Sequence, residues 1–254
     1  MVNLWNEIIL RPMLNGLVAL SGILPEEVEF GLAIIIFTLV VRLALTPVTI
    51  KQTKSTRALQ ELQPKMKELQ KKFAKNKAKL QQETMKLYKE AGVNPAGCMW
   101  PMLIQFPVWI ALYQSIMKAL ATTPENLLDL AQHLYSSDMI ARAIPVNSHF
   151  LWLDLGQPDK TMVLAILVGG TMWVQQKMTT APSTDSRQQS TNQMMLMMMP
   201  LMFGMFTIMF PSGLPVFWLV SNLIGIGTQY VVGGGWGNLK RSNTAGSPAT
   251  ARAK

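Results

Sequence analysis

The chain has 254 residues, of which 49% are hydrophobic and only 15% are charged. Together with several long uncharged runs, this composition is typical of a polytopic membrane protein. The formal net charge of +9 could suggest a nucleic-acid partner, but the charges are not distributed as on a nucleic-acid surface, so we expect no direct nucleic-acid specificity. The single cysteine, Cys98, excludes an intramolecular disulfide and a cysteine cluster for zinc.

Residues 1–24 place polar side chains at every fourth position, namely Asn3, Glu7, Arg11 and Asn15, with apolar residues between them. This pattern predicts an interfacial amphipathic helix. A membrane span is the alternative, which the arginine, proline, asparagine and glycine within the segment disfavour. Acidic residues at 26, 27 and 29 contrast with the basic residues from 51 onward, so the positive-inside rule places the N-terminus outside the cytoplasm.

Residues 30–50 form the first predicted span, because about twenty apolar residues cross a hydrocarbon core of about 30 Å. Arg42 lies deep in this span, and Pro47 leaves the carbonyl of Leu43 without its helical partner. Such groups are tolerated in a membrane only where neighbouring helices or water satisfy them. We therefore predict that Arg42 faces a wet cavity. The alternative is an arginine at the inner end of a tilted helix that reaches the headgroups.

Residues 51–92 carry twelve basic side chains, which predicts a cytoplasmic segment. Apolar residues recur at spacings of three and four on both sides of Asn76, as in the seam of an antiparallel helical hairpin. A solvated loop without a partner is the alternative. The seam residues are Leu59, Leu62, Met66, Leu69 and Phe73, followed by Leu80, Thr84, Leu87 and Ala91.

The remainder of the chain alternates apolar and polar segments, and its loop charges are consistent with five spans, an outer N-terminus and an inner C-terminus. The predicted segments are a second span at 93–118, an outer loop at 119–160, a short third span at 161–177, a cytoplasmic turn at 178–190, a fourth span at 191–210, a fifth span at 215–232 and a basic, disordered cytoplasmic tail at 233–254. A short span thins the membrane locally.

Two features of these spans leave alternatives open. Gln105 and Gln114 interrupt the second span, where each either faces the cavity of Arg42 or bonds to a neighbouring helix. Methionines crowd the fourth span, which suits either a surface for varied apolar partners or simple contact with lipid. His133 and His149 lie in the outer loop without ligand-like spacing, so we expect both to be exposed.

Catalytic machinery has no counterpart among these motifs. The sequence contains no G-x-x-x-x-G-K cradle, no H-E-x-x-H motif and no pair of carboxylates within a span. Arg42 is the single ionisable group inside a predicted span, and it attracts negative charge without serving as a base at neutral pH. We therefore predict a binding site rather than an enzyme, with no catalytic residue, metal or cofactor.

Several stretches resemble one family, the YidC/Oxa/Alb membrane protein insertases. They are FTLVVRLALTPVTIKQ, LQPKMKELQKKF, ETMKLYKEAGVNPAGCMWPMLIQFPVWIALYQ, GGTMWVQQKM and MPLMFGMFTIMFPSGLPVFWLVSNL. The resemblance implies an all-α membrane protein, with five transmembrane helices around a hydrophilic groove open to the cytoplasm, a cytoplasmic helical hairpin and the N-terminal interfacial helix. The sequence is similar to the shorter form of the family, without a large periplasmic domain or a long basic C-terminal extension.

The resemblance also assigns residues by motif position. Arg42 and Thr38 match polar groove positions, Trp218 matches the aromatic position of the last span, and Gln175 or Gln176 matches the polar position of the third span. The remaining candidates are Gln105 for the groove, Met195, Met198, Met202 and Phe217 for a hydrophobic slide, and Lys65, Lys67, Lys71 and Lys72 for recruitment by the hairpin.

The function that the resemblance implies is insertion and folding of integral membrane proteins in a bacterial plasma membrane, without nucleotide hydrolysis. Expected partners are nascent membrane proteins, the lipid bilayer, the Sec translocon, the ribosome and the signal-recognition machinery; ribosome binding through the short tail stays open. In the inferred mechanism, acidic groups of a substrate pair transiently with Arg42 while its apolar segment moves along the methionine-rich face. An anion channel that uses Arg42 as its selectivity charge is the rival, and a structural assembly factor is a third possibility.

Overall fold

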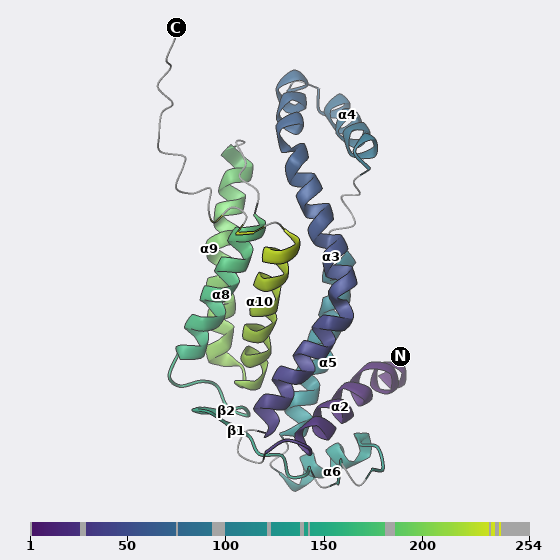
Figure 1. The fold of residues 1–254 in the computed structure, drawn as a ribbon, viewed down its shortest axis with the longest axis vertical. Helices are drawn as coiled ribbons and strands as arrows, with labels where there is room; N and C mark the ends of the chain where they lie inside the picture. The colour runs from purple at the N-terminus through teal and green to yellow at the C-terminus, as the bar shows by residue number, and fades with distance from the viewer. Residues whose placement is uncertain are drawn as a thin grey trace.

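The computed structural model describes residues 2–25, 29–74, 76–92, 100–120, 123–137, 140–141, 143–180, 186–233, 235–236 and 239. This part of the chain is mostly helical (Figure 1). In chain order it contains α1 (Val2–Trp5), the π-helix η1 (Asn6–Leu10), α2 (Arg11–Ser21), α3 (Glu29–Lys72), α4 (Lys77–Glu90), α5 (Trp100–Ala119), α6 (Pro124–His133), β1 (His149–Phe150), β2 (Leu153–Asp154), α8 (Val163–Thr179), α9 (Ser186–Met209) and α10 (Gly213–Val232).

Three helices within the described residues are long and apolar enough to cross a membrane. They are the Phe30–Lys72 part of α3, the Gln189–Met209 part of α9, and α10 (Gly213–Val232). Helix α8 has only 17 residues, in line with the short third span that the sequence predicts. Helix α5 contains two glutamines and Pro107, and residues 93–99 at the start of the predicted second span lie outside the described part.

Helix α3 is much longer than the span predicted at 30–50. It continues for 44 residues through Pro47 and Pro64. The hydroxyls of Thr46 and Thr49 donate to the carbonyls of Arg42 and Leu45, at 2.8 and 3.1 Å, and such bonds help a helix to continue past a proline. The change from apolar to basic residues near 50 therefore marks a change of surroundings and not the end of a helix.

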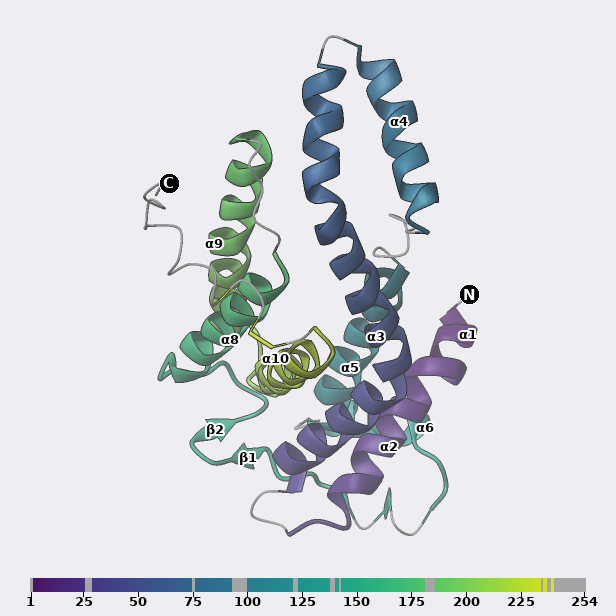
Figure 2. The same ribbon diagram turned by 45° about the horizontal axis from the view of Figure 1, so that its top comes forward.

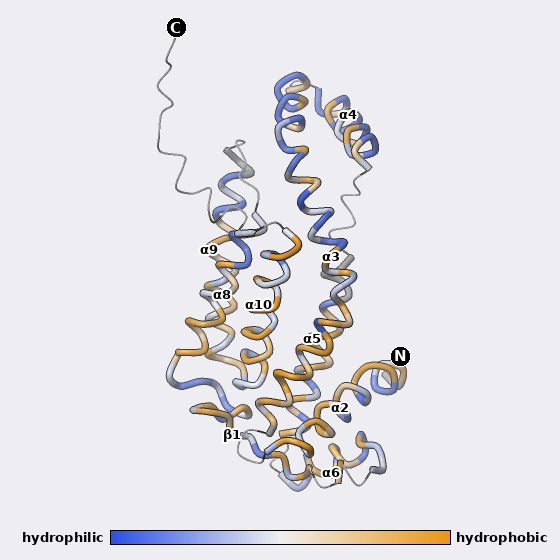
Figure 3. Tube along the Cα trace, viewed as in Figure 1, coloured by the Kyte–Doolittle hydropathy of each residue, from blue (hydrophilic) through white to orange (hydrophobic). Residues whose placement is uncertain are grey.

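The far end of α3 and α4 together form a hairpin that projects away from the other helices (Figures 1 and 2). Its turn lies at 73–76, where the Asn76 side chain caps α4 by accepting from the Lys79 N–H at 3.0 Å. Hydropathy colouring shows that the hairpin is largely hydrophilic (Figure 3), and α4 has no buried residue. Lys65, Lys67, Lys71 and Lys72 all lie on the α3 arm of this hairpin.

The core lies at the opposite end of the molecule, where the strands β1 and β2 pair; we call this the strand end. There α2 packs on α3 and α5, while α10 joins α3 to α8, and α8 packs against α9. Buried apolar members of this core include Leu14, Leu17, Val18, Phe30, Ile34, Leu112, Ile116, Leu155, Leu164 and Leu214. The bundle is therefore anchored at one end only, and its helices are free of this core toward the hairpin end.

The N-terminal helices differ from the predicted interfacial helix in one respect. Asn15 belongs to the polar stripe that the sequence places toward water, yet it is buried. Its Nδ2 donates to the carbonyl of His133 at 3.0 Å, and its Oδ1 accepts from the N–H of Tyr135 at 2.6 Å. His133 is consequently half-buried rather than exposed, whereas His149 is exposed as expected. Packing against α6 explains both differences.

Residues 149–164 close the strand end. The carbonyl of Gln157 accepts from both the N–H and the hydroxyl of Ser212, at 2.8 and 2.7 Å, and the Gly213 N–H donates to Leu155 at 3.0 Å. On the other side, the ring of Phe150 lies directly on Gly31 of α3. One short segment therefore ties the beginning of α10 to the beginning of α3.

Candidate functional site

A cavity of about 580 Å³ lies between α3, α5, α8, α9 and α10. Its described wall residues are Arg42, Leu45, Val48, Thr49, Gln52, Thr53 and Thr56 on α3, Gln105 and Trp109 on α5, Met172, Gln175, Gln176 and Thr179 on α8, Thr180 just after it, Met195 and Met199 on α9, and Trp218, Ser221, Asn222, Gly225, Thr228 and Gln229 on α10. Hydroxyl and amide groups dominate the walls toward the hairpin end, where water suits such groups.

Arg42 is the one charged residue among the described residues that line the cavity. Its Nε is buried and has no hydrogen-bond partner, and none of the ion pairs between described residues includes it. A buried, unpaired positive charge is unfavourable unless an anion or water reaches it. The structure thus supports the predicted interpretation of Arg42, with the cavity extending from Arg42 to Thr56 over about 21 Å of helix.

The structure brings several predicted groove residues to this cavity. Gln105, Trp218, Gln175 and Gln176 all line it, so the choice between the two glutamines of α8 does not arise. The Gln175 amide lies against Gly225 of α10, where a Cβ atom would come within 2.8 Å of its Cδ. The Gln176 Nε2 lies 3.8 Å from the sulfur of Met199.

Two predicted residues lie elsewhere. Thr38 is fully buried, and its hydroxyl donates to the carbonyl of Ile34 at 2.6 Å. It does not line the cavity, because it faces the core one turn closer to the strand end. Phe217 is only 2% exposed and belongs to the same core, so it cannot form part of an exposed apolar slide. These two placements correct the interpretation of the sequence.

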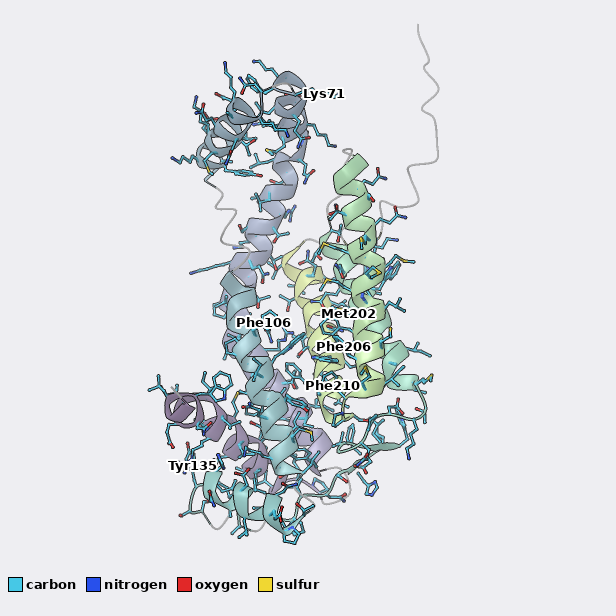
Figure 4. All side chains as sticks on the ribbon, turned by 180° about the vertical axis from the view of Figure 1, so that it is seen from behind. Lys71, Phe106, Tyr135, Met202, Phe206 and Phe210 are labelled. Carbon is cyan, nitrogen blue, oxygen red and sulfur yellow. The ribbon has the colours of Figure 1, made fainter. Side chains whose placement is uncertain are left out.

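The methionines proposed as a slide lie along α9. Met195 lines the cavity, while Met198 and Met202 are 53% and 41% exposed on the helix surface (Figure 4). Several other α9 side chains are exposed beside them, namely Met194, Met197, Leu201, Met205 and Met209. Met195 is thus the point where the cavity wall meets an apolar outer face.

An aromatic cluster, which the sequence analysis missed, separates the cavity from the strand end. Trp109 and Trp218 line the cavity, and their ring centroids lie 5.6 Å apart. Phe203 packs on both, at 5.4 and 5.1 Å, and Phe206 and Phe210 continue the cluster toward the strand end (Figure 4). These residues come from three helices distant in sequence, so no local pattern predicts their meeting.

Polar residues of the cavity wall were also missed, although a signal for some exists. Thr49, Gln52, Thr53 and Thr56 follow Arg42 at helical spacing on α3, and this pattern could have been found once α3 was known to continue past 50. Asn222 on α10 donates to the Thr171 hydroxyl of α8 at 3.3 Å. Ser221 carries no sequence signal beyond lying three residues after Trp218.

These observations define a class of protein: a mostly helical protein with membrane-spanning helices and a polar cavity that contains one unpaired arginine. The model of the family described as 60Kd inner membrane protein matches residues 23–235. The chain belongs to this family, the YidC/Oxa/Alb proteins.

Relatives from several bacteria match most of the chain. Membrane protein insertase YidC 2 of Bacillus anthracis is 36% identical over 249 residues, which cover 96% of this chain and 86% of that protein. Membrane protein insertase YidC of Oceanobacillus iheyensis is 40% identical over 230 residues, or 87% and 80% of the two chains. The Haemophilus influenzae protein of the same name is 38% identical over 229 residues, which cover 90% of this chain but 37% of that protein.

Proposed function

We propose that this chain is a membrane protein insertase that inserts integral membrane proteins and helps them to fold. The observation that carries the proposal is Arg42, a buried and unpaired positive charge in a polar cavity between apolar helices. Membership in a family whose relatives are named membrane protein insertases supports it.

The proposed topology has five spans, formed by the first part of α3 and by α5, α8, α9 and α10. The strand end lies outside and the hairpin lies in the cytoplasm of a bacterial cell, with an outer N-terminus and an inner C-terminus. The basic residues of the hairpin support this orientation through the positive-inside rule. In this arrangement the cavity opens toward the cytoplasm and the aromatic cluster seals it from outside, which gives a one-sided groove.

In the proposed mechanism, a hydrophilic segment of the substrate enters the cavity from the hairpin end and shortens its path across the membrane. Its acidic groups pair transiently with Arg42, while its apolar segment passes Met195 and moves along Met198 and Met202 into lipid. Burial of the apolar segment is favourable. A membrane potential adds about 2.3 kcal/mol per charge per 100 mV for anionic segments that move outward. No nucleotide is needed.

The hairpin is proposed to receive substrates and their delivery factors. Lys65, Lys67, Lys71 and Lys72 lie on its α3 arm, away from the bundle. Their charges suit transient contacts with the ribosome, the signal-recognition machinery or the Sec translocon, because exposed charges accelerate encounter more than they strengthen a complex.

A reconstitution tests the proposal. The purified full chain is placed in liposomes without ATP, and a short single-span substrate with an acidic outer segment is added from the hairpin side. Protease protection of the outer segment should require the protein. If liposomes with and without the protein protect the substrate equally, the proposal is wrong. Protein-dependent chloride efflux without protection would favour the anion channel instead.

A further inference from the structure

Three buried donor atoms near the strand end of the cavity have no hydrogen-bond partner. They are the Nε of Arg42, the Nε1 of Trp218 and the Oγ of Ser221, and among the described residues no other buried side-chain nitrogen or oxygen is left unpaired. All three residues line the same cavity. A buried donor without a partner is costly, so three at one place indicate a common ligand.

Ser221 differs from the other buried hydroxyls of the bundle. Thr38, Ser115 and Thr207 are fully buried, and each donates to the carbonyl four residues earlier, at 2.6, 2.7 and 2.9 Å. This local bond is the usual way in which serine and threonine satisfy themselves within a helix. Ser221 is 2% exposed and does not make it. Its hydroxyl therefore remains available for a partner outside its own helix.

We propose that Ser221 and Trp218 complete, together with Arg42, a directional site for one carboxylate. Trp218 and Ser221 are three residues apart on α10 and so share one face of that helix, and α10 packs against α3, which carries Arg42. The set offers one positive charge and three donors. A carboxylate matches it, because it carries one negative charge and its two oxygens accept about four hydrogen bonds.

The carboxylate must come from another molecule. No aspartate or glutamate is among the described residues that line the cavity. The inference rests on the proposed function, in that the natural source is an acidic side chain of the inserted segment. Arg42 alone attracts any anion, whereas the two neutral donors of α10 fix where its oxygens lie. Ser221 is accordingly a residue that determines specificity for acidic segments.

A lipid phosphodiester offers similar chemistry, with one negative charge and two free oxygens. The three donor atoms are closed off from solvent, and the rings of Trp109 and Phe203 pack around Trp218. A planar carboxylate with one substituent fits such a place better than a tetrahedral group with two substituents. The test therefore compares acetate with dimethyl phosphate.

Binding is measured on the full chain in detergent, with its tryptophan indoles labelled with ¹⁵N and the Trp218 signal assigned from the Trp218→Phe variant. Titration with acetate at constant ionic strength should shift the Trp218 signal to saturation. Ser221→Ala should weaken acetate binding about tenfold, as expected for one hydrogen bond to a charged group. Ser221→Cys, which keeps a weak donor, should weaken it less. Ser115→Ala is the matched control and should bind as the wild type does.

Two results would overturn the site: no saturable shift with acetate, or equal binding by the wild type and a folded Ser221→Ala variant. A shift with dimethyl phosphate but none with acetate would equally overturn it, in favour of a lipid headgroup.

A second measurement separates the site from the proposed function. Two substrates differ only by aspartate or asparagine in the outer segment, and Ser221→Ala should slow the aspartate substrate more than the asparagine substrate. An equal effect on both contradicts the inference. If the wild type binds acetate but inserts neither substrate, the proposed function fails; if it inserts both without binding acetate, the carboxylate site fails.

Discussion

The two ends of the bundle treat buried polar groups in opposite ways. At the strand end, Asn15, Asp159 and Ser212 are buried, and each is hydrogen-bonded to backbone from another part of the chain. In the cavity, Arg42 and Ser221 contribute buried atoms with no partner at all. The paired groups hold segments together, because breaking such bonds leaves buried polar atoms exposed to an apolar environment.

The unpaired groups of the cavity contribute nothing comparable to the fold. Leaving them unsatisfied costs stability, and a protein keeps such groups where a ligand uses them. The comparison predicts that substitutions at the strand end reduce stability, whereas substitutions in the cavity reduce function and spare stability.

The largest contrast is expected in solvent access. With Cys98→Ser as background, cysteines at Gln52 and Gln175 should react with a membrane-impermeant thiol reagent added from the hairpin side. A cysteine at Thr38 should react about a hundredfold or more slowly, because a fully buried position reacts only through local opening that costs about 3 kcal/mol or more. All three should react alike after unfolding in strong detergent. Rapid labelling of Thr38 would place the cavity floor closer to the strand end.

Arg42 should separate function from stability. Arg42→Ala should slow insertion of substrates with acidic outer segments about tenfold or more, since a charge-assisted bond is lost, and Arg42→Glu should abolish it. Arg42→Lys should keep much of the activity. The thermal midpoint of Arg42→Ala should be unchanged or raised, because a buried unpaired charge is removed. A strongly lowered midpoint would mean that Arg42 supports the fold.

Gly31 tests the strand end. A Cβ atom at this position would lie 2.6 Å from the Cβ of Phe150 and closer still to its ring, so β1 must shift. Gly31→Ala should therefore reduce stability by about 2 kcal/mol, as overpacking does, although alanine favours a helix. Thermal unfolding measures the change. Gly227→Ala is the control, because a Cβ there meets nothing within 4 Å; equal midpoints for the two variants would contradict the packing argument.

The sequence predicted the elements whose limits depend on local signals. The prolines and glycine at 211–215 separate α9 from α10 within two residues of the predicted spans. The continuation of α3 past 50 was not predicted, because the boundary was inferred from charge, and charge alone does not end a helix.

Other features depend on contacts between distant residues. Arg42 was identified because its charge is anomalous wherever the helix faces, whereas a threonine such as Thr38 is equally satisfied facing a cavity or bonded to its own helix. Asn15 is buried by backbone groups more than a hundred residues away. Ser221 is notable only through a hydrogen bond that it does not make.

Gly225 should show a smaller effect confined to the cavity. An alanine Cβ would displace the flexible Gln175 amide rather than the backbone, so Gly225→Ala should leave the thermal midpoint unchanged. Insertion should slow about threefold, the value of one neutral hydrogen bond. Gln175→Ala should have the same effect, and the double variant should be no slower than either, because both changes remove the same contact. Additive losses would show that Gly225 does not act through Gln175.

The smallest expected effect is the acid sensitivity of the strand end through Asp159. Burial by itself would raise the pKa of Asp159, but hydrogen bonds from the Thr161 hydroxyl and from the N–H groups of Leu164 and Thr161 outweigh it and lower the pKa below its ordinary value. A lowered pKa in the folded state contributes stability above the unfolded pKa of about 3.9, and this is lost as pH falls through the folded value.

Asp159→Asn should therefore be about 1 kcal/mol less stable than the wild type at pH 7, where the carboxylate caps the first turn of α8. The difference should shrink as pH falls below about 4. Asp129, whose pKa is lowered by the hydrogen bond from Lys118, contributes to acid loss in both proteins, so the difference between their midpoints isolates Asp159. A difference that stays constant from pH 7 to pH 3 would mean that the side chain caps α8 without its charge.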